Sequence, residues 1–127
     1  MAEEFWTRPI FVVRDLEASI AYYREKLGFE KRWEHGRDRL IVAQVGRGGL
    51  DVILDCGSVL RRPAATSVLS MTLHRPEALA DLYREFTDRR AKIVSPPFAV
   101  VWQEGTYELD VEDLDGNVLI FWGAKPP

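Results

Sequence analysis

At 127 residues with 46% hydrophobic content, the chain is long enough for one globular core, and we predict a single domain over 1–127. The net charge of -3 comes without any basic stripe, which argues against a nucleic-acid partner. No window approaches the ~20 apolar residues of a membrane helix, so no membrane partner is expected. The single cysteine, Cys56, excludes an intrachain disulfide and a thiolate metal cluster, and with the acidic, non-apolar start it favours the reducing cytoplasm.

The first half of the chain, about 6–56, is predicted to run strand–helix–strand–strand–strand. Residues 8–13 are expected to form a strand with Pro9, Phe11 and Val13 on one face. A helix follows, with apolar residues at helical spacing, an N-cap at Asp15 and a terminating glycine at Gly28. Three further strands are expected at 29–33, 40–45 and 50–54.

A polar linker near 57–66 leads into a second half, about 67–123, with the same predicted order of elements. Its first strand is expected at 68–73, with Ser70 on the face turned away from the helix. The helix after it carries an apolar stripe, and Pro76 suits its first turn. The remaining strands are expected at 92–94, 106–111 and 118–122.

The two halves also resemble each other residue by residue. Residues 17–25 align with 77–85, sixty positions later, and five of the nine pairs are identical. Helices favour Ala, Glu and Arg everywhere, so chance similarity is the alternative, but the flanking elements match as well. We therefore predict an α+β fold of two βαβββ modules, forming a curved mixed sheet with helices on its outer face and an open cleft on the other.

Two strings carry a family resemblance. Residues 14–29 (RDLEASIAYYREKLGF) and 112–121 (EDLDGNVLIF) resemble the opening and closing motifs of the vicinal-oxygen-chelate superfamily, which comprises glyoxalase, bleomycin resistance protein and dioxygenase relatives. The bleomycin-resistance-type drug binders are the most similar branch. The resemblance implies the glyoxalase/bleomycin-resistance fold and a homodimer with clefts built from both chains. It leaves function open, because this superfamily hosts isomerases, dioxygenases, thiol transferases and non-catalytic drug binders.

The resemblance also implies where the enzymes of the family hold their metal. Those positions fall on Arg8, Val68, Asp51 and Ile120 in this chain. A divalent cation needs three or four oxygen or nitrogen ligands, so one carboxylate beside an arginine is insufficient. We therefore expect no metal, no cofactor and no catalytic residue. Arg8 and Asp51 are expected to meet, either as a salt bridge in the vacated site or as polar contacts to a ligand.

The tryptophans point to a different use of the cleft. Trp122 shares strand parity with Ile120 and should face the cleft. The resemblance places Trp33 where bleomycin-resistance proteins carry an aromatic residue that stacks on the drug. Trp102 precedes Gly105, which stands where that branch usually has a tryptophan, so the pocket is expected to differ there. The alternative for each tryptophan is a place in the core or in a dimer interface.

These observations favour a metal-free binding protein over an enzyme. Its expected ligand is an aromatic, peptide-like antibiotic or natural product held in a dimer cleft, for drug resistance or self-protection. The expected ligand-binding residues are Arg8, Trp33, Asp51, Ser70, Trp102 and Trp122. Two alternatives stay open. One is a glyoxalase-like lyase, isomerase or dioxygenase, either metal-free or with an atypical or displaced metal site, in which Asp51, Glu108 or tyrosines carry protons. The other is an accessory or regulatory dimer without a small ligand.

Overall fold

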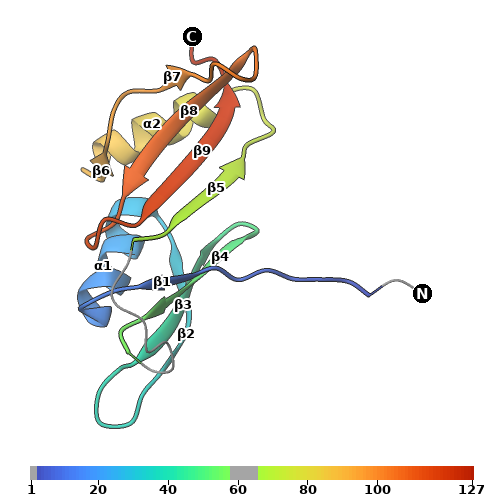
Figure 1. Cartoon of the computed structure of the whole chain (residues 1–127). Helices are drawn as coiled ribbons and strands as arrows, with labels where there is room; N and C mark the ends of the chain where they lie inside the picture. The colour runs from blue at the N-terminus through green and yellow to red at the C-terminus, as the bar shows by residue number, and fades with distance from the viewer. Residues whose placement is uncertain (1–2, 58–65) are drawn as a thin grey trace.

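The computed structural model describes residues 3–57 and 66–127, which form two halves arranged end to end (Figure 1). The first half consists of β1 (Ile10–Val12), α1 (Leu16–Leu27), β2 (Glu30–His35), β3 (Val42–Arg47) and β4 (Leu50–Asp55). The second consists of β5 (Val68–Thr72), α2 (Ala78–Asp88), β6 (Lys92–Ile93), β7 (Phe98–Ala99), β8 (Thr106–Glu112) and β9 (Val118–Ala124). Among these residues, no helix is long and apolar enough to cross a membrane.

Each half builds its own mixed sheet, and the two sheets share one topology. The strand order is β1-β4-β3-β2 in the first sheet and β5-β9-β8-β6 in the second, where the short β7 also pairs with β8. In both sheets the first and last strands of the half lie parallel, and the remaining neighbours are antiparallel. The α+β class and the repeated βαβββ order are as predicted, and β7 is the strand that the sequence did not reveal.

The two helices begin differently. At α1 the Asp15 carboxylate accepts the Ala18 amide at 3.1 Å, and Gly28 ends the helix in the left-handed region at φ 72°, both as predicted. At α2 the residue before the helix is Glu77, whose side chain makes no capping bond. Pro76 therefore precedes the helix instead of occupying its first turn.

The predicted linker near 57–66 lies for the most part outside the described residues, which leave out 58–65.

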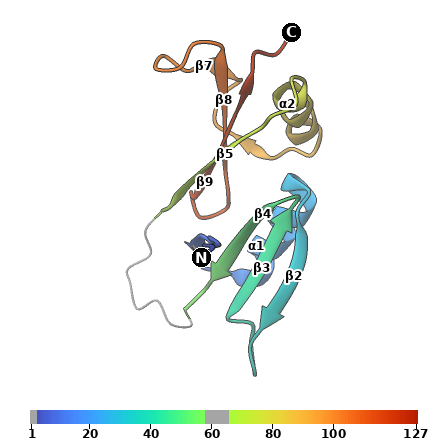
Figure 2. The same cartoon turned by 90° about the vertical axis from the view of Figure 1, so that its right-hand side faces the viewer.

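Each helix covers one face of its sheet, and these faces make the core. The side chains on the covered faces are fully or almost fully buried; they include Phe11, Val45, Val52, Leu54, Leu109, Val111, Leu119 and Phe121. Burying a side chain of this size stabilises the fold by about 1.5–3 kcal/mol. Alternation along the strands leaves every second residue on the opposite face, which no helix covers (Figures 1 and 2).

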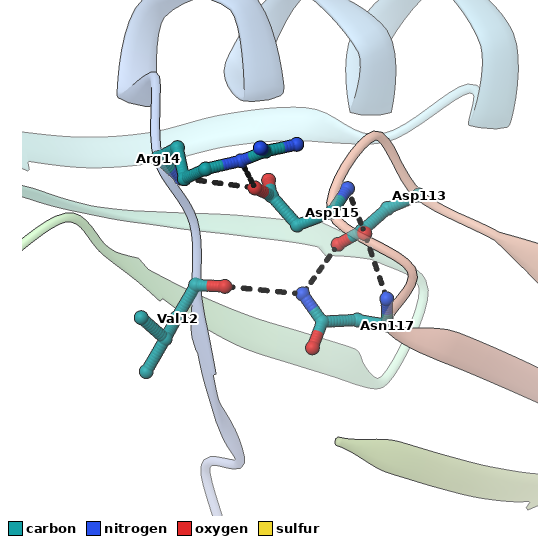
Figure 3. Close-up of polar contacts among 5 residues, drawn as sticks. All are labelled: Val12, Arg14, Asp113, Asp115 and Asn117. Carbon is teal, nitrogen blue, oxygen red and sulfur yellow. Dashed lines mark hydrogen bonds and ion pairs between the residues drawn. The ribbon is translucent and has the colours of Figure 1, made fainter. Parts of the chain in front are cut away.

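The turn between β8 and β9 fastens the second half to the first (Figure 3). The Asn117 side-chain amide donates to the Val12 carbonyl at 3.3 Å and to the Asp113 carboxylate at 2.9 Å. The Asp115 carboxylate accepts both the backbone and the guanidinium N–H of Arg14 at 3.1 Å. The closing motif that carries the family resemblance therefore holds the free edge of β1.

Two tyrosines of α1 complete this junction between the halves. The Tyr23 hydroxyl donates to Asp113 at 2.9 Å, and the Tyr22 hydroxyl donates to the Glu112 carbonyl at 2.6 Å while accepting the Lys92 amide at 2.9 Å. Burial raises the pKa of both hydroxyls, and for Tyr23 the neighbouring Asp113 charge raises it further. Both groups therefore stay neutral and act as hydrogen-bond donors.

Candidate functional site

A row of paired residues crosses the open face of the first sheet. Ile10 of β1 lies beside Ile53 of β4, Ile53 beside Gln44 of β3, and Gln44 beside Trp33 of β2. The Gln44 side-chain oxygen accepts the Trp33 indole N–H at 2.9 Å and a guanidinium N–H of Arg8 at 3.2 Å. Trp33 remains 38% exposed. Gln44 therefore orients two of the predicted site residues on this face.

Asp51 pairs with a different arginine from the one we predicted. Its carboxylate accepts the Arg32 guanidinium at 3.1 Å, while Arg8 is bonded to Gln44, so the expected Arg8–Asp51 salt bridge does not form. Arg32 is the extra residue of a β-bulge between Lys31 and Trp33, which places its side chain within reach of Asp51. A bulge of this kind shifts the strand register locally, and strand parity alone does not show it.

The absence of a side chain at Gly46 leaves space for the Arg32–Asp51 ion pair. It lies opposite Asp51 in the β3–β4 register, and a Cβ atom there would collide with the Asp51 carboxylate and the Arg32 guanidinium. A larger residue at this position would force the pair apart.

The open face of the second sheet carries what we call the Trp–acid cluster: Trp102, Trp122, Glu108 and Asp110. Trp122 of β9 pairs directly with Glu108 of β8, and its indole N–H donates to the Glu108 carboxylate at 2.7 Å. Trp102, from the loop after β7, stacks edge-on against Trp122 with ring centroids 5.4 Å apart and planes at 86°. Trp102 is 64% exposed, so one large aromatic surface of the cluster faces solvent.

Asp110 is the functional candidate that the sequence reading missed. It pairs with Ile120, and Ile120 in turn pairs with Ser70, so all three share the open face. Its Oδ1 atom is buried and has no hydrogen-bond partner within the described chain. Desolvation, reinforced by the hydrogen bond and charge of Glu108, raises the pKa of Asp110 to about 7. The alternation of Glu108, Asp110 and Glu112 along β8 was the signal that could have drawn attention to it.

The repeat shows why this carboxyl group is unusual. Gln44 pairs with Ile53 in the first sheet as Asp110 pairs with Ile120 in the second, so the two polar residues occupy equivalent positions. Gln44 is satisfied by two donors from its own half, whereas one Asp110 oxygen is buried without a partner. A buried acceptor of this kind costs about 1–3 kcal/mol unless something bonds to it, so the open face of the second sheet is suited to a donor from outside the half.

The six predicted ligand-binding residues thus fall into two groups. Trp33 and Asp51 lie on strands of the first sheet, and Arg8, just before β1, bonds to Gln44 of that sheet. Ser70 and Trp122 lie on strands of the second sheet, and Trp102, in the loop after β7, contacts Trp122. The open faces of the two sheets look in different directions in the two views (Figures 1 and 2). Ser70 is exposed beside Ile120, as strand parity predicted.

The implied metal positions do not suit a metal. Val68 and Ile120 have no ligand atoms in their side chains, and Asp51 is engaged by Arg32. Across residues 3–57 and 66–127, no three His, Cys, Asp or Glu side chains gather closely enough to hold a metal ion. Because this donor set does not fit a divalent cation, no reaction step is assigned to one.

A family model described as the Glyoxalase/Bleomycin resistance protein/Dioxygenase superfamily matches residues 7–121. The chain belongs to this superfamily. The resemblance seen in residues 14–29 and 112–121 is thereby confirmed at the level of the superfamily. Members of the superfamily include both enzymes and non-catalytic binding proteins, so membership leaves the activity to be argued from the site.

Solved structures of low sequence identity to the chain have the same fold. A glyoxalase/bleomycin resistance protein/dioxygenase from Nocardioides matches with a TM-score of 0.71 and 19% identity, over 98% of this chain and 85% of that one. TioX from Micromonospora sp. ML1 gives 0.72 and 15%, over 97% and 98%. A glyoxalase-related enzyme from Clostridium phytofermentans gives 0.75 and 14%, over 98% of each chain. No curated protein sequence matches the chain.

Proposed function

We propose that this superfamily member is a metal-free binding protein of the bleomycin-resistance type. It sequesters an aromatic, peptide-like antibiotic or related natural product in the cytoplasm, for resistance or self-protection. The observation that carries the proposal is the Trp102–Trp122 pair, a large and exposed aromatic surface on a sheet face that no helix covers. An exposed aromatic surface lowers the solubility of a protein unless a ligand or a partner covers it.

The cluster suits a flat ligand with polar groups at its edge. Stacking an aromatic ring on an exposed indole contributes roughly 0.5–1.5 kcal/mol beyond area burial, and each Å² of apolar area adds about 25 cal/mol. Glu108 is bonded to the Trp122 ring and lies next to Asp110, and both carboxylates can accept N–H donors, of which a peptide-like ligand has several. Two or three such contacts are sufficient for binding in the micromolar range.

The proposed cleft is completed by a second copy of the chain. Arg8 and the half-exposed Trp33 lie at the open face of the first sheet. The segment before β1 extends away from the body (Figures 1 and 2), and in it Phe5 is 88% and Trp6 87% exposed. Association would cover these apolar groups and bring Arg8 opposite the acids of the partner's second sheet. Light scattering tests this step, because a mass of 14.6 kDa at micromolar concentration would contradict the dimer.

Tryptophan fluorescence tests the binding site itself. Titration with intercalating and thiazole-type antibiotics is expected to quench the protein, and Trp102→Ala should lose most of the quenching. Leu114→Ala is the control, because Leu114 is exposed on the turn between β8 and β9 and lies outside the Trp–acid cluster. Absence of quenching across a broad panel, or equal quenching in Trp102→Ala, would overturn the proposal.

A glyoxalase-like enzyme is the second candidate, and Asp110 is the observation that favours it. A carboxyl group with a pKa of about 7 beside Glu108 can take up or release a proton at neutral pH. If the protein is an enzyme, Asp110→Asn should abolish turnover while leaving ligand quenching intact. Elemental analysis discriminates further, because near-stoichiometric zinc, nickel, manganese or iron would favour the enzyme.

A further inference from the structure

A cavity lies at the junction of the two halves, apart from the Trp–acid cluster. Its volume is about 710 Å³, and its walls come from both halves. The first half contributes Phe29 and Leu50, and the second half contributes Leu73, Leu82 and Phe121. Leu82 and Phe121 belong to the helix-covered side of the second sheet, and Figure 2 shows the tip of the β3–β4 hairpin below α2.

The two arginines and two acids that line this cavity, Arg47, Arg75, Asp81 and Glu85, form ion pairs with one another. Arg47 donates to both oxygens of Glu85 at 2.6 and 2.7 Å, and Arg89 adds a third bond to Glu85 at 2.9 Å. Arg75 donates to Asp81 at 2.9 Å. Hydrogen bonds from these arginines lower the pKa of Glu85 and of Asp81, so both acids are ionised at neutral pH. A ligand that complements this rim has no net charge of its own.

We propose that this cavity binds an uncharged, largely apolar small molecule that bridges the two halves of the chain. Its volume lies within the roughly 300–1,000 Å³ of ordinary small-molecule sites, and its floor is aliphatic and aromatic. A charged ligand would lose its hydration without meeting an unpaired counter-charge. The cavity shares no residue with the Trp–acid cluster, so this second site does not depend on the function proposed above.

A matched pair of fluorescent probes tests the charge preference. N-phenyl-1-naphthylamine is neutral, and 8-anilino-1-naphthalenesulfonate has the same ring system with one added negative charge. The neutral probe should bind the full-length protein at least about tenfold more tightly, because the two arginines that line the cavity, Arg47 and Arg75, are already paired with carboxylates. It should also raise the thermal midpoint, since it contacts both halves. Equal or tighter binding of the sulfonate, or no saturable binding of the neutral probe, would overturn the proposal.

Variants then locate the probe. Leu50→Asp introduces a charge into the cavity wall and should weaken binding of the neutral probe at least about tenfold, whereas Leu114→Asp, on the exposed β8–β9 turn, should not. Ala78→Phe places a large side chain in the cavity from α2 and should weaken binding of the neutral probe to the same extent. If circular dichroism shows that Leu50→Asp is unfolded, Ala78→Phe alone tests whether the probe binds in the cavity. Loss of binding in Trp102→Ala, or unchanged binding in Ala78→Phe, would place the probe elsewhere and refute the site.

Discussion

Trp122 and Glu108 face each other on the two central strands of the second sheet, and the indole N–H donates to the carboxylate at 2.7 Å. This bond fixes the Trp122 ring against the sheet and gives Trp102 a surface to stack on. It also places a carboxylate beside Asp110, whose pKa Glu108 helps to raise. One hydrogen bond therefore links the aromatic surface of the cluster to its acidity.

Trp102→Ala should separate binding from stability. The side chain is 64% exposed, so its removal should change the free energy of unfolding by no more than about 0.5 kcal/mol. The loss of one stacking partner should weaken an aromatic ligand by roughly 0.5–1.5 kcal/mol, a change of several-fold in Kd. Urea unfolding and fluorescence titration measure the two effects. A strongly destabilised variant would indicate that Trp102 belongs to the core.

Glu108→Gln should lower the pKa of Asp110. The substitution keeps an acceptor for the Trp122 indole but removes the negative charge that favours protonation of Asp110. Because burial of Asp110 is the larger cause and remains, the pKa should fall below about 7 without reaching that of an exposed aspartate. Carboxyl ¹³C chemical shifts followed against pH give the value. An unchanged titration would show that the two acids do not interact.

Asp110→Asn should remove a pH dependence of stability. The folded carboxyl has a pKa of about 7, whereas an unfolded aspartate titrates near about 3.9. Between these values the folded state holds a proton that the unfolded state releases, so the free energy of unfolding falls as pH rises from about 4 to about 7. Above that window the variant should be more stable than the wild type by on the order of 1 kcal/mol, since the site is partly open to solvent. Urea unfolding at about pH 5 and about pH 8 checks this, and equal slopes in both proteins would contradict it.

Tyr23→Phe should weaken the junction between the halves. The buried hydroxyl donates to Asp113, and its loss leaves a buried carboxylate with one donor fewer, at a cost of about 1.5–3 kcal/mol in the free energy of unfolding. Tyr83→Phe is the matched control, because Tyr83 holds the repeat position in α2 and its hydroxyl makes no hydrogen bond within the described chain. Chemical denaturation of both variants measures the difference. Equal stability losses would show that the Asp113 bond is not the cause.

Local sequence signals predicted much of the fold. Asp15 and Gly28 marked the ends of α1 because capping depends on a few neighbouring residues. The sixty-residue offset predicted the repeated topology, and strand parity placed Trp122 and Ser70 on open faces. The strands at β2 and β3 were predicted one or two residues early, since the bulge after Lys31 and the turn before Val42 have no such local signature.

The sequence by itself indicated the superfamily, through the motifs at 14–29 and 112–121. It also determined most of the order of elements and the face on which most candidate residues lie, because these follow from short-range periodicity and capping. Only the tertiary structure decided the pairs: Arg32 with Asp51, Arg8 with Gln44, and Tyr23 with Asp113 across the junction. It also decided that Asp110 titrates near neutrality. Desolvation and distance between charges are properties of the packed chain, and side chains far apart in sequence acquire them only when the strands and halves come together.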